Sequence, residues 1–336
     1  GGVGKTALVN EWRNRLCERE GGPELVFDWS FASQGVRERG AVSADPFLRE
    51  ALRFFGEVEY AESNASPLAK GTRLAAIVGE RRALLILDGV EPLQAPPQGA
   101  GSSCALREGS IANLLRCLAA RNRGLCIVTT REPVHDLEGF ESTTVRRLNL
   151  AHLSEEAGAE LLASLLAACK RPKQVVSTRA ERAEISVAVE GHALTLQLLG
   201  VYIRHALGDI RRWREIDFGR ADEEQGGFAF RVMAAYVTWL SGAGIREQRQ
   251  LALLRLFGFF DRPADPGCIA ALLDAPAIPG VTETLVGLDA QGWASLTSSL
   301  AQMRLVTQRD YDVPPVSGYD EAAALEAGEE GRPSGE

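Results

Sequence analysis

The most informative stretch of the sequence is Gly1-Gly2-Val3-Gly4-Lys5-Thr6, which runs directly into an amphipathic segment with Leu8, Trp12 and Leu16 at helical spacing. Glycines let successive backbone N–H groups converge on phosphate oxygens at the start of a helix. The run matches the end of the phosphate-binding loop G-x-x-x-x-G-K-S/T, whose first glycine would precede Gly1. The alternative is a structural Gly-rich turn with an incidental Lys-Thr pair. We expect nucleotide binding by Gly2, Val3, Gly4, Lys5, Thr6 and Ala7.

Beyond this stretch, strand-like and helix-like segments alternate up to about residue 150. This alternation predicts right-handed β–α–β crossovers and a doubly wound parallel sheet, the α/β fold of a P-loop NTPase domain over residues 1–150. We expect the first strand to precede Gly1, so the chain should be a piece of a longer protein, poorly stable without its preceding residues. The expected strands are 25–31, 83–87, 125–129 and 143–150, and the expected helices are 4–20, 46–55, 68–82 and 111–120.

After residue 150 the pattern becomes purely helical, which predicts a helical second domain over 151–220. The polar, Gly-rich segment 221–227 suggests a boundary before a third unit over 225–310. Pro and Gly divide its later part into short elements, which suits a compact helical domain with a small hairpin. Residues 311–336 are acidic and poor in large apolar side chains, so we expect a disordered tail or linker. The individual helices expected are 154–169, 176–190, 193–206, 228–240 and 246–257.

An acid ends the buried strand 83–87. In P-loop proteins, an Asp at this point holds the water shell of Mg²⁺ beside the Thr of the phosphate loop, so Thr6 and Asp88 are the expected Mg²⁺ ligands. The alternative is an ordinary turn that starts at Asp88 and continues through Gly89. The catalytic Glu that often follows this Asp is replaced by Gly89, and Glu91 is the nearest acid able to polarise water.

A further polar group, Thr129-Thr130-Arg131, follows the strand 125–129. Ligands bind at the carboxyl ends of the strands in open parallel sheets. We therefore expect Thr130 to contact the nucleotide and Arg131 to reach the γ phosphate through charge-assisted hydrogen bonds. The alternative is that Arg131 is an ordinary solvent-facing loop residue.

The chain is 336 residues long and 45% hydrophobic, and its 45 acids against 37 Lys plus Arg give a net charge of −8. This globular composition argues against broad binding to nucleic acid or anionic lipid. No apolar stretch approaches the roughly 18 residues that a membrane helix needs. The six cysteines are scattered without a C-x-x-C pair, which favours a reducing cytoplasm and disfavours a cysteine metal site.

Four segments in order resemble the STAND signal-transduction ATPases, the NB-ARC and NACHT-like switches: GGVGKT (1–6), LLILDGVEPLQ (84–94), VTTREPV (128–134) and GHALTL (191–196). The first is specific only to P-loop proteins, whereas the four together are specific to this family. The resemblance covers residues 1 to about 308. It implies a P-loop sheet, a helical lid and a winged-helix domain that close over bound ADP, with His192, Ala193 and Leu194 near adenine and ribose.

The resemblance further implies a molecular switch that is compact with ADP and extended with ATP, self-associates in the ATP state and activates an attached effector. The effector would precede Gly1 and the sensor would follow Glu336. Hydrolysis should be slow, through water attack assisted by Lys5 and Arg131. One departure is that no His follows His205, although the family usually places a β-phosphate-binding His in its winged helix; Gln302-Met303-Arg304 stands near that region instead.

Two other functions stay open. The first is a DNA-binding transcriptional regulator, whose best support is the arginine set Arg246, Arg249 and Arg255 on one expected helix. A gel shift with strong salt dependence would favour it. The second is a metabolic ATPase or kinase, which a turnover above roughly one per second would favour.

Overall fold

The sheet at the base of the fold has three parallel strands, in the order β1 (Leu25–Ser30), β2 (Ala83–Asp88) and β3 (Leu125–Val128). It belongs to a computed structural model that describes residues 2–19, 21–31, 43–96, 104–167, 175–218, 227–260, 264–274 and 276–307. The central strand, β2, is buried from Ala83 to Leu87, as its continuous apolar run predicts. Parallel pairing brings the carboxyl ends of all three strands to one edge.

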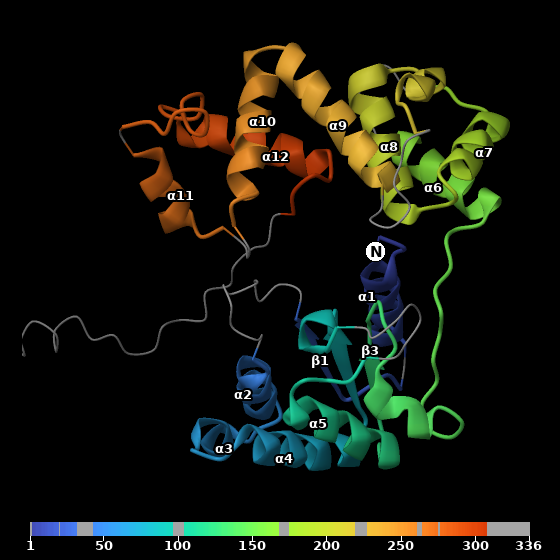
Figure 1. Cartoon of the computed structure of the whole chain (residues 1–336), viewed down its shortest axis with the longest axis vertical. Helices are drawn as coiled ribbons and strands as arrows, with labels where there is room; N and C mark the ends of the chain where they lie inside the picture. The colour runs from blue at the N-terminus through green and yellow to red at the C-terminus, as the bar shows by residue number, and fades with distance from the viewer. Residues whose placement is uncertain are drawn as a thin grey trace, which may run out of the picture.

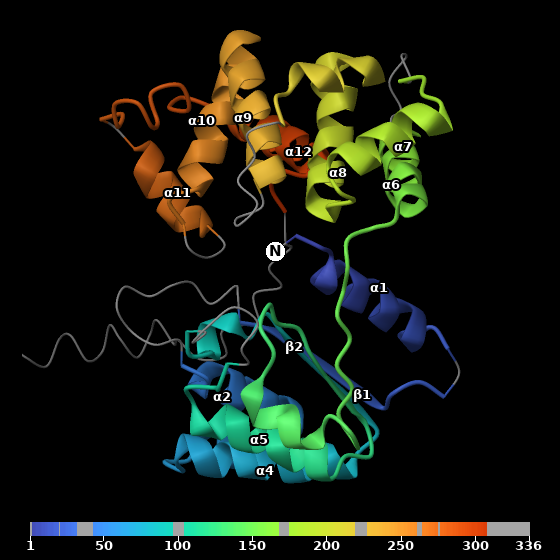
Figure 2. The same ribbon diagram turned by 45° about the vertical axis from the view of Figure 1, so that its right-hand side comes forward.

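Helices lie on both sides of this sheet. In Figures 1 and 2, α1 (Lys5–Cys17) lies on one side and α4 (Pro67–Glu80) and α5 (Gly109–Ala120) on the other. Ser66 caps α4 by accepting the Ala69 amide, and Pro67 occupies its first turn. This part is completed by α2 (Asp45–Phe54), α3 (Val58–Glu62) and the 3₁₀ turns Glu91–Leu93 and His135–Phe140.

The predicted α/β character and parallel sheet are confirmed, but the strand expected over 143–150 is wrong. The amides of Thr143 and Val145 both donate to the Phe140 carbonyl, so the chain turns there instead of pairing with the sheet. From residue 145 it runs without regular structure and leaves Leu148 75% exposed. The alternating pattern therefore reflects an extended connection, which Figure 1 shows leading up to the helical part.

The second part of the chain is entirely helical over its described residues. The helices before residue 219 and after residue 226 share one apolar core. Tyr236 of α9 (Gly227–Gly242) packs against Tyr202 of α8 (Ala193–Tyr202), with the ring centroids 4.9 Å apart, and its hydroxyl donates to the Leu198 carbonyl. The core around the sheet is separate and draws on residues 31–134. The helices are α6 (Glu155–Ala167), α7 (Arg179–Ala188), α8 (Ala193–Tyr202), α9 (Gly227–Gly242), α10 (Ile245–Phe257), α11 (Pro266–Leu273) and α12 (Ala290–Gln302), with a π turn at Ile203–Leu207 and a 3₁₀ turn at Ile210–Glu215.

The small hairpin expected in the third unit is absent from its described residues, 227–260, 264–274 and 276–307. The segment between α11 and α12 closes on itself instead, because the Thr282 hydroxyl accepts the Ile278 amide. Arg249, one of the three arginines on α10, donates to the Thr284 carbonyl and so ties α10 to this segment. The boundary predicted at 221–227 lies almost wholly outside the described residues, as does the tail at 311–336.

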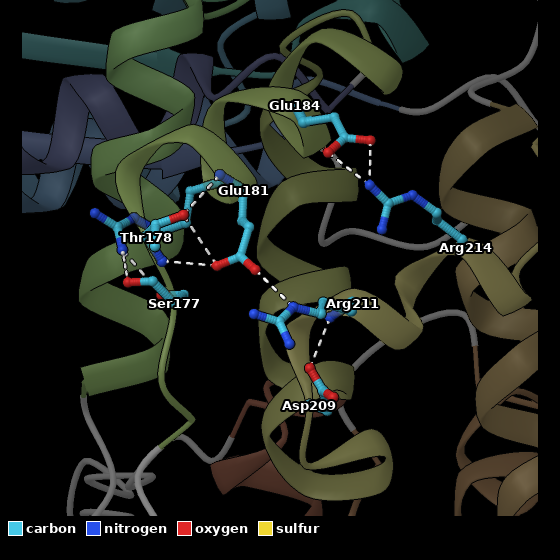
Figure 3. Close-up of polar contacts among 8 residues, drawn as sticks. Ser177, Thr178, Glu181, Glu184, Asp209, Arg211 and Arg214 are labelled. Carbon is cyan, nitrogen blue, oxygen red and sulfur yellow. Dashed lines mark hydrogen bonds and ion pairs between the residues drawn. The ribbon is translucent and has the colours of Figure 1, made fainter.

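Ionic contacts join α7 to the 3₁₀ turn that follows α8 (Figure 3). A reciprocal capping box between Thr178 and Glu181 starts α7, three residues later than predicted. Glu181 also pairs with Arg211 at 2.8 Å, and Arg214 pairs with Glu184. The Thr178 amide and then Arg211 lower the pKa of Glu181 to about 2. Since this pKa lies below its unfolded value, the stabilisation by Glu181 is present above pH 4.5 and is lost as the pH falls toward 2.

None of the described helices combines the length and apolar character needed to cross a bilayer.

Candidate functional site

The start of α1 meets the carboxyl end of β2. The Thr6 hydroxyl donates to both carboxylate oxygens of Asp88, at 2.9 Å to Oδ1 and 3.1 Å to Oδ2. These residues are 82 positions apart in the chain, and the parallel sheet brings the strand end to the helix start. Thr6 and Asp88, the two residues expected to bind Mg²⁺, therefore lie in direct contact and both carry oxygen atoms of the kind that Mg²⁺ prefers.

Lys5 stands beside this pair at the first position of α1. Its side chain is half-buried and makes no hydrogen bond or ion pair with any residue of the described ranges. The helix start has no acidic residue in its first turn and no side-chain cap, because Gly4 occupies the N-cap position. The helix start therefore carries a partial positive charge that no acidic side chain of its first turn neutralises, and Lys5 adds a cation to the same turn, which suits an anion.

The glycine-rich loop before α1 lies open at the surface. Gly2, Thr6 and Ala7 are exposed, and Val3 and Gly4 are partly exposed. Gly2 and Gly4 both adopt positive φ, at 76° and 101°. This is a backbone conformation that other residues rarely adopt, so the two glycines are needed for the shape of the loop.

Thr129 is a site residue that sequence reasoning missed. Its hydroxyl donates to Asp88 Oδ1 at 2.6 Å and accepts the Gly89 amide at 2.8 Å. The signal for it was the register: Leu87 stands opposite Val128, so Asp88 stands opposite Thr129. Our prediction singled out Thr130 instead, and the Thr130 hydroxyl bonds to Gln94 Oε1 at 2.7 Å within the turn after β3.

The two residues predicted to act on the γ phosphate lie near one another. Arg131 Nε approaches Glu91 Oε1 at 3.8 Å, with the Arg131 side chain 69% exposed. This weak, solvated contact leaves both side chains able to reorient. Their roles toward a phosphate stay predictions.

The glycine-rich loop also touches the beginning of α8. The Leu194 amide donates to the Gly2 carbonyl at 3.0 Å. His192, buried at 6% exposure, caps α8 by accepting the Thr195 amide on Nδ1, and Ala193 follows in the first turn. An added Cβ on Gly2 would lie 2.8 Å from His192 Cε1 and 2.9 Å from Leu194 Cβ. The three predicted lid residues are thus placed at the loop, with His192 in a structural capping role.

The Gly2 contact predicts a specific mutational result. Gly2→Ala should detach the loop from α8, because the new methyl group overlaps His192 and Leu194. The Leu194 amide belongs to the first turn of α8, whose N–H groups have no acceptor within the helix. Its protection from hydrogen exchange therefore depends on its hydrogen bond to the Gly2 carbonyl. We expect faster hydrogen exchange at the Leu194 amide in nucleotide-free protein.

Gly4→Ala is the matched control. It carries a similar backbone cost of about 1–2 kcal/mol for a non-glycine residue at positive φ, but its added Cβ would meet nothing within 4 Å. Leu194 exchange should stay as in the unmodified chain. An equal acceleration in both variants would show that the loop–lid contact does not depend on close packing at Gly2.

The residues present fit magnesium and phosphate better than a protein-only metal cage. No group of three or more His, Cys, Asp or Glu residues gathers as metal ligands within the described residues. Mg²⁺ is usually held by one or two protein oxygens, with phosphate oxygens and water completing six ligands. Thr6 and Asp88 supply that kind of partial ligand set beside a Gly-rich helix start.

The chain matches no known family model, and no curated protein resembles it significantly.

Proposed function

We propose that this chain is the ATP/ADP-binding molecular switch of a STAND-type signalling protein. The observation that carries the proposal is the 2.9 Å hydrogen bond from the Thr6 hydroxyl to Asp88, with Lys5 preceding Thr6 at the first position of α1. A Gly-rich loop, a lysine, a hydroxyl and a strand-end carboxylate at one place match what a nucleoside phosphate with Mg²⁺ requires.

Each residue has a definite part in binding. The backbone amides of Gly2 to Thr6 cradle phosphate oxygens, and Lys5 supplies a cation to the β and γ phosphates. Thr6 and Asp88 hold Mg²⁺, which neutralises phosphate charge when bound. Arg131 donates charge-assisted hydrogen bonds to the γ phosphate, and Glu91 orients water. Gly89 follows Asp88 where fast ATPases carry a Glu, which supports slow hydrolysis at most.

The switch follows from what the loop touches. The hydrogen bond from the Leu194 amide to the Gly2 carbonyl couples the start of α8 to the position of the loop. The connection from residue 145 to 154, which joins the two parts of the chain, has no regular structure. Because the lid and the third unit share one core, a shift of α8 carries both. Nucleotide at the loop therefore acts on the whole helical part: ADP favours the compact arrangement, and ATP favours an extended one that self-associates and activates an attached effector.

Sedimentation of the chain with Mg²⁺-ADP and with Mg²⁺-ATP tests this function. We expect a monomer with ADP and a larger species with ATP, and ATP turnover well below roughly one per second. Identical sedimentation with both nucleotides would overturn the switch. A turnover in the usual enzyme range would instead indicate a metabolic ATPase or kinase.

A further inference from the structure

The Thr129 hydroxyl lies in a fixed hydrogen-bonding position between the side chain of Asp88, the last residue of β2, and the amide of Gly89, which follows it. It accepts the Gly89 amide at 2.8 Å and donates to Asp88 Oδ1 at 2.6 Å, and the residue is only 6% exposed. A threonine hydroxyl has one hydrogen, and an amide can only donate. The hydroxyl hydrogen is therefore directed at the carboxylate, in the short geometry typical of bonds to a charged acceptor.

The backbone of Thr129 is held as firmly as its side chain. Its amide donates to the Leu87 carbonyl at 3.0 Å, and its carbonyl accepts the Val90 amide at 3.1 Å. These bonds tie Thr129 to the end of β2 and to the turn that follows it, directly after the last β2–β3 pair, Leu87 and Val128. The oxygen that meets Asp88 is thus fixed by the sheet and does not depend on a mobile loop.

The two threonines at Asp88 differ in this respect. Thr6 is exposed at the start of α1 and contacts both oxygens of the carboxylate, at 2.9 and 3.1 Å. Thr129 is buried and contacts only Oδ1. If the Thr6 hydroxyl turns toward a metal ion, Thr129 still holds Oδ1, and Oδ2 is left facing the start of α1.

We propose that Thr129 is a positioning residue that orients the Asp88 carboxylate toward Mg²⁺. It acts through Asp88 and does not touch the nucleotide. This inference rests on the proposed nucleotide site and adds to it a residue on which the magnesium affinity of that site depends.

The test compares ADP affinity with Mg²⁺ and with EDTA in each protein. Thr129→Val keeps the shape of the side chain and removes the hydroxyl, whereas Thr129→Ser keeps the hydroxyl. Removing partners that orient a metal ligand usually lowers metal affinity about 10- to 100-fold. We expect the gain in ADP affinity on adding Mg²⁺ to fall by that factor in the Val variant, to persist in the Ser variant, and the affinity in EDTA to be unchanged in both.

The ADP affinities with Mg²⁺ and with EDTA are measured on the same sample. Partial unfolding of a variant lowers both affinities by the same factor, so it cancels from their ratio. Thr129→Cys, which keeps the size and offers only a weak donor, replaces the Val variant if the latter does not fold. An unchanged ratio in the Val or Cys variant overturns the proposal, and so does an equal loss of affinity with Mg²⁺ and with EDTA, since that indicates a purely structural role. Failure of the proposed function is distinct: the unmodified chain would bind no ADP in either condition.

Discussion

Replacing Lys5 with Ala should weaken ADP and ATP binding by at least about 100-fold while leaving the fold intact. Lys5 has no hydrogen-bond or ion-pair partner in the described part of the chain, so the substitution removes no polar interaction of the free protein there. A bound nucleotide loses charge-assisted hydrogen bonds to two phosphates. Each contributes about 1.5–3 kcal/mol, and about 1.4 kcal/mol corresponds to tenfold in affinity.

Isothermal titration calorimetry with Mg²⁺-ADP and Mg²⁺-ATP measures this effect, and circular dichroism checks the fold. Arg15→Ala is the matched control: it removes a cation from the last turn of the same helix, where Arg15 pairs with Glu11 in solvent at 2.8 Å. We expect its nucleotide affinity to equal that of the unmodified chain. If Lys5→Ala also kept full affinity, the phosphate-loop assignment would fail.

Replacing Asp88 with Asn should abolish the dependence of nucleotide binding on Mg²⁺. Asn has nearly the same shape but carries no negative charge, and its amide nitrogen, in place of the second carboxylate oxygen, can neither accept a hydrogen bond nor act as an oxygen ligand of Mg²⁺. The expected loss of Mg²⁺ affinity is about 100-fold or more. Removing a residue that only orients a metal ligand lowers metal affinity about 10- to 100-fold. The loss of Mg²⁺ affinity in Asp88→Asn should therefore exceed the loss in Thr129→Val.

The measurement is ADP affinity over a series of Mg²⁺ concentrations, with EDTA as the metal-free reference. Asp28→Asn is the control, because Asp28 lies on the neighbouring strand β1 and pairs with Arg13 in solvent at 2.8 Å. Its Mg²⁺ dependence should be unaltered. Loss of ADP affinity by Asp88→Asn in EDTA to the same degree would mean that Asp88 shapes the loop without holding the metal.

Much of the α/β part was predictable because hydrophobic patterning and helix caps act locally. The run 83–87 is uniformly apolar, so a buried central strand was the natural prediction. The meeting of Thr6 and Asp88 was predictable as well, since a helix start and a strand end come to the same edge of a parallel sheet.

The features that escaped prediction all depend on contacts between distant segments. The alternation over 143–150 is the same for an edge strand and for an exposed connection, and only the presence of a pairing strand distinguishes them. Thr129 required the register of β2 against β3. The packing of Tyr236 on Tyr202, which joins the lid to the third unit, crosses a segment of polar and Gly residues that indicated a boundary.

Equilibrium titration of the chain with Mg²⁺-ADP is the decisive test of the proposed switch. We expect saturable binding of one nucleotide per chain, which Lys5→Ala removes. Binding should stabilise the fold by about 2.7 kcal/mol when free ADP is 100 times its Kd. The absence of ADP and ATP binding by a folded chain, or binding that Lys5→Ala leaves unchanged, would contradict the proposed switch.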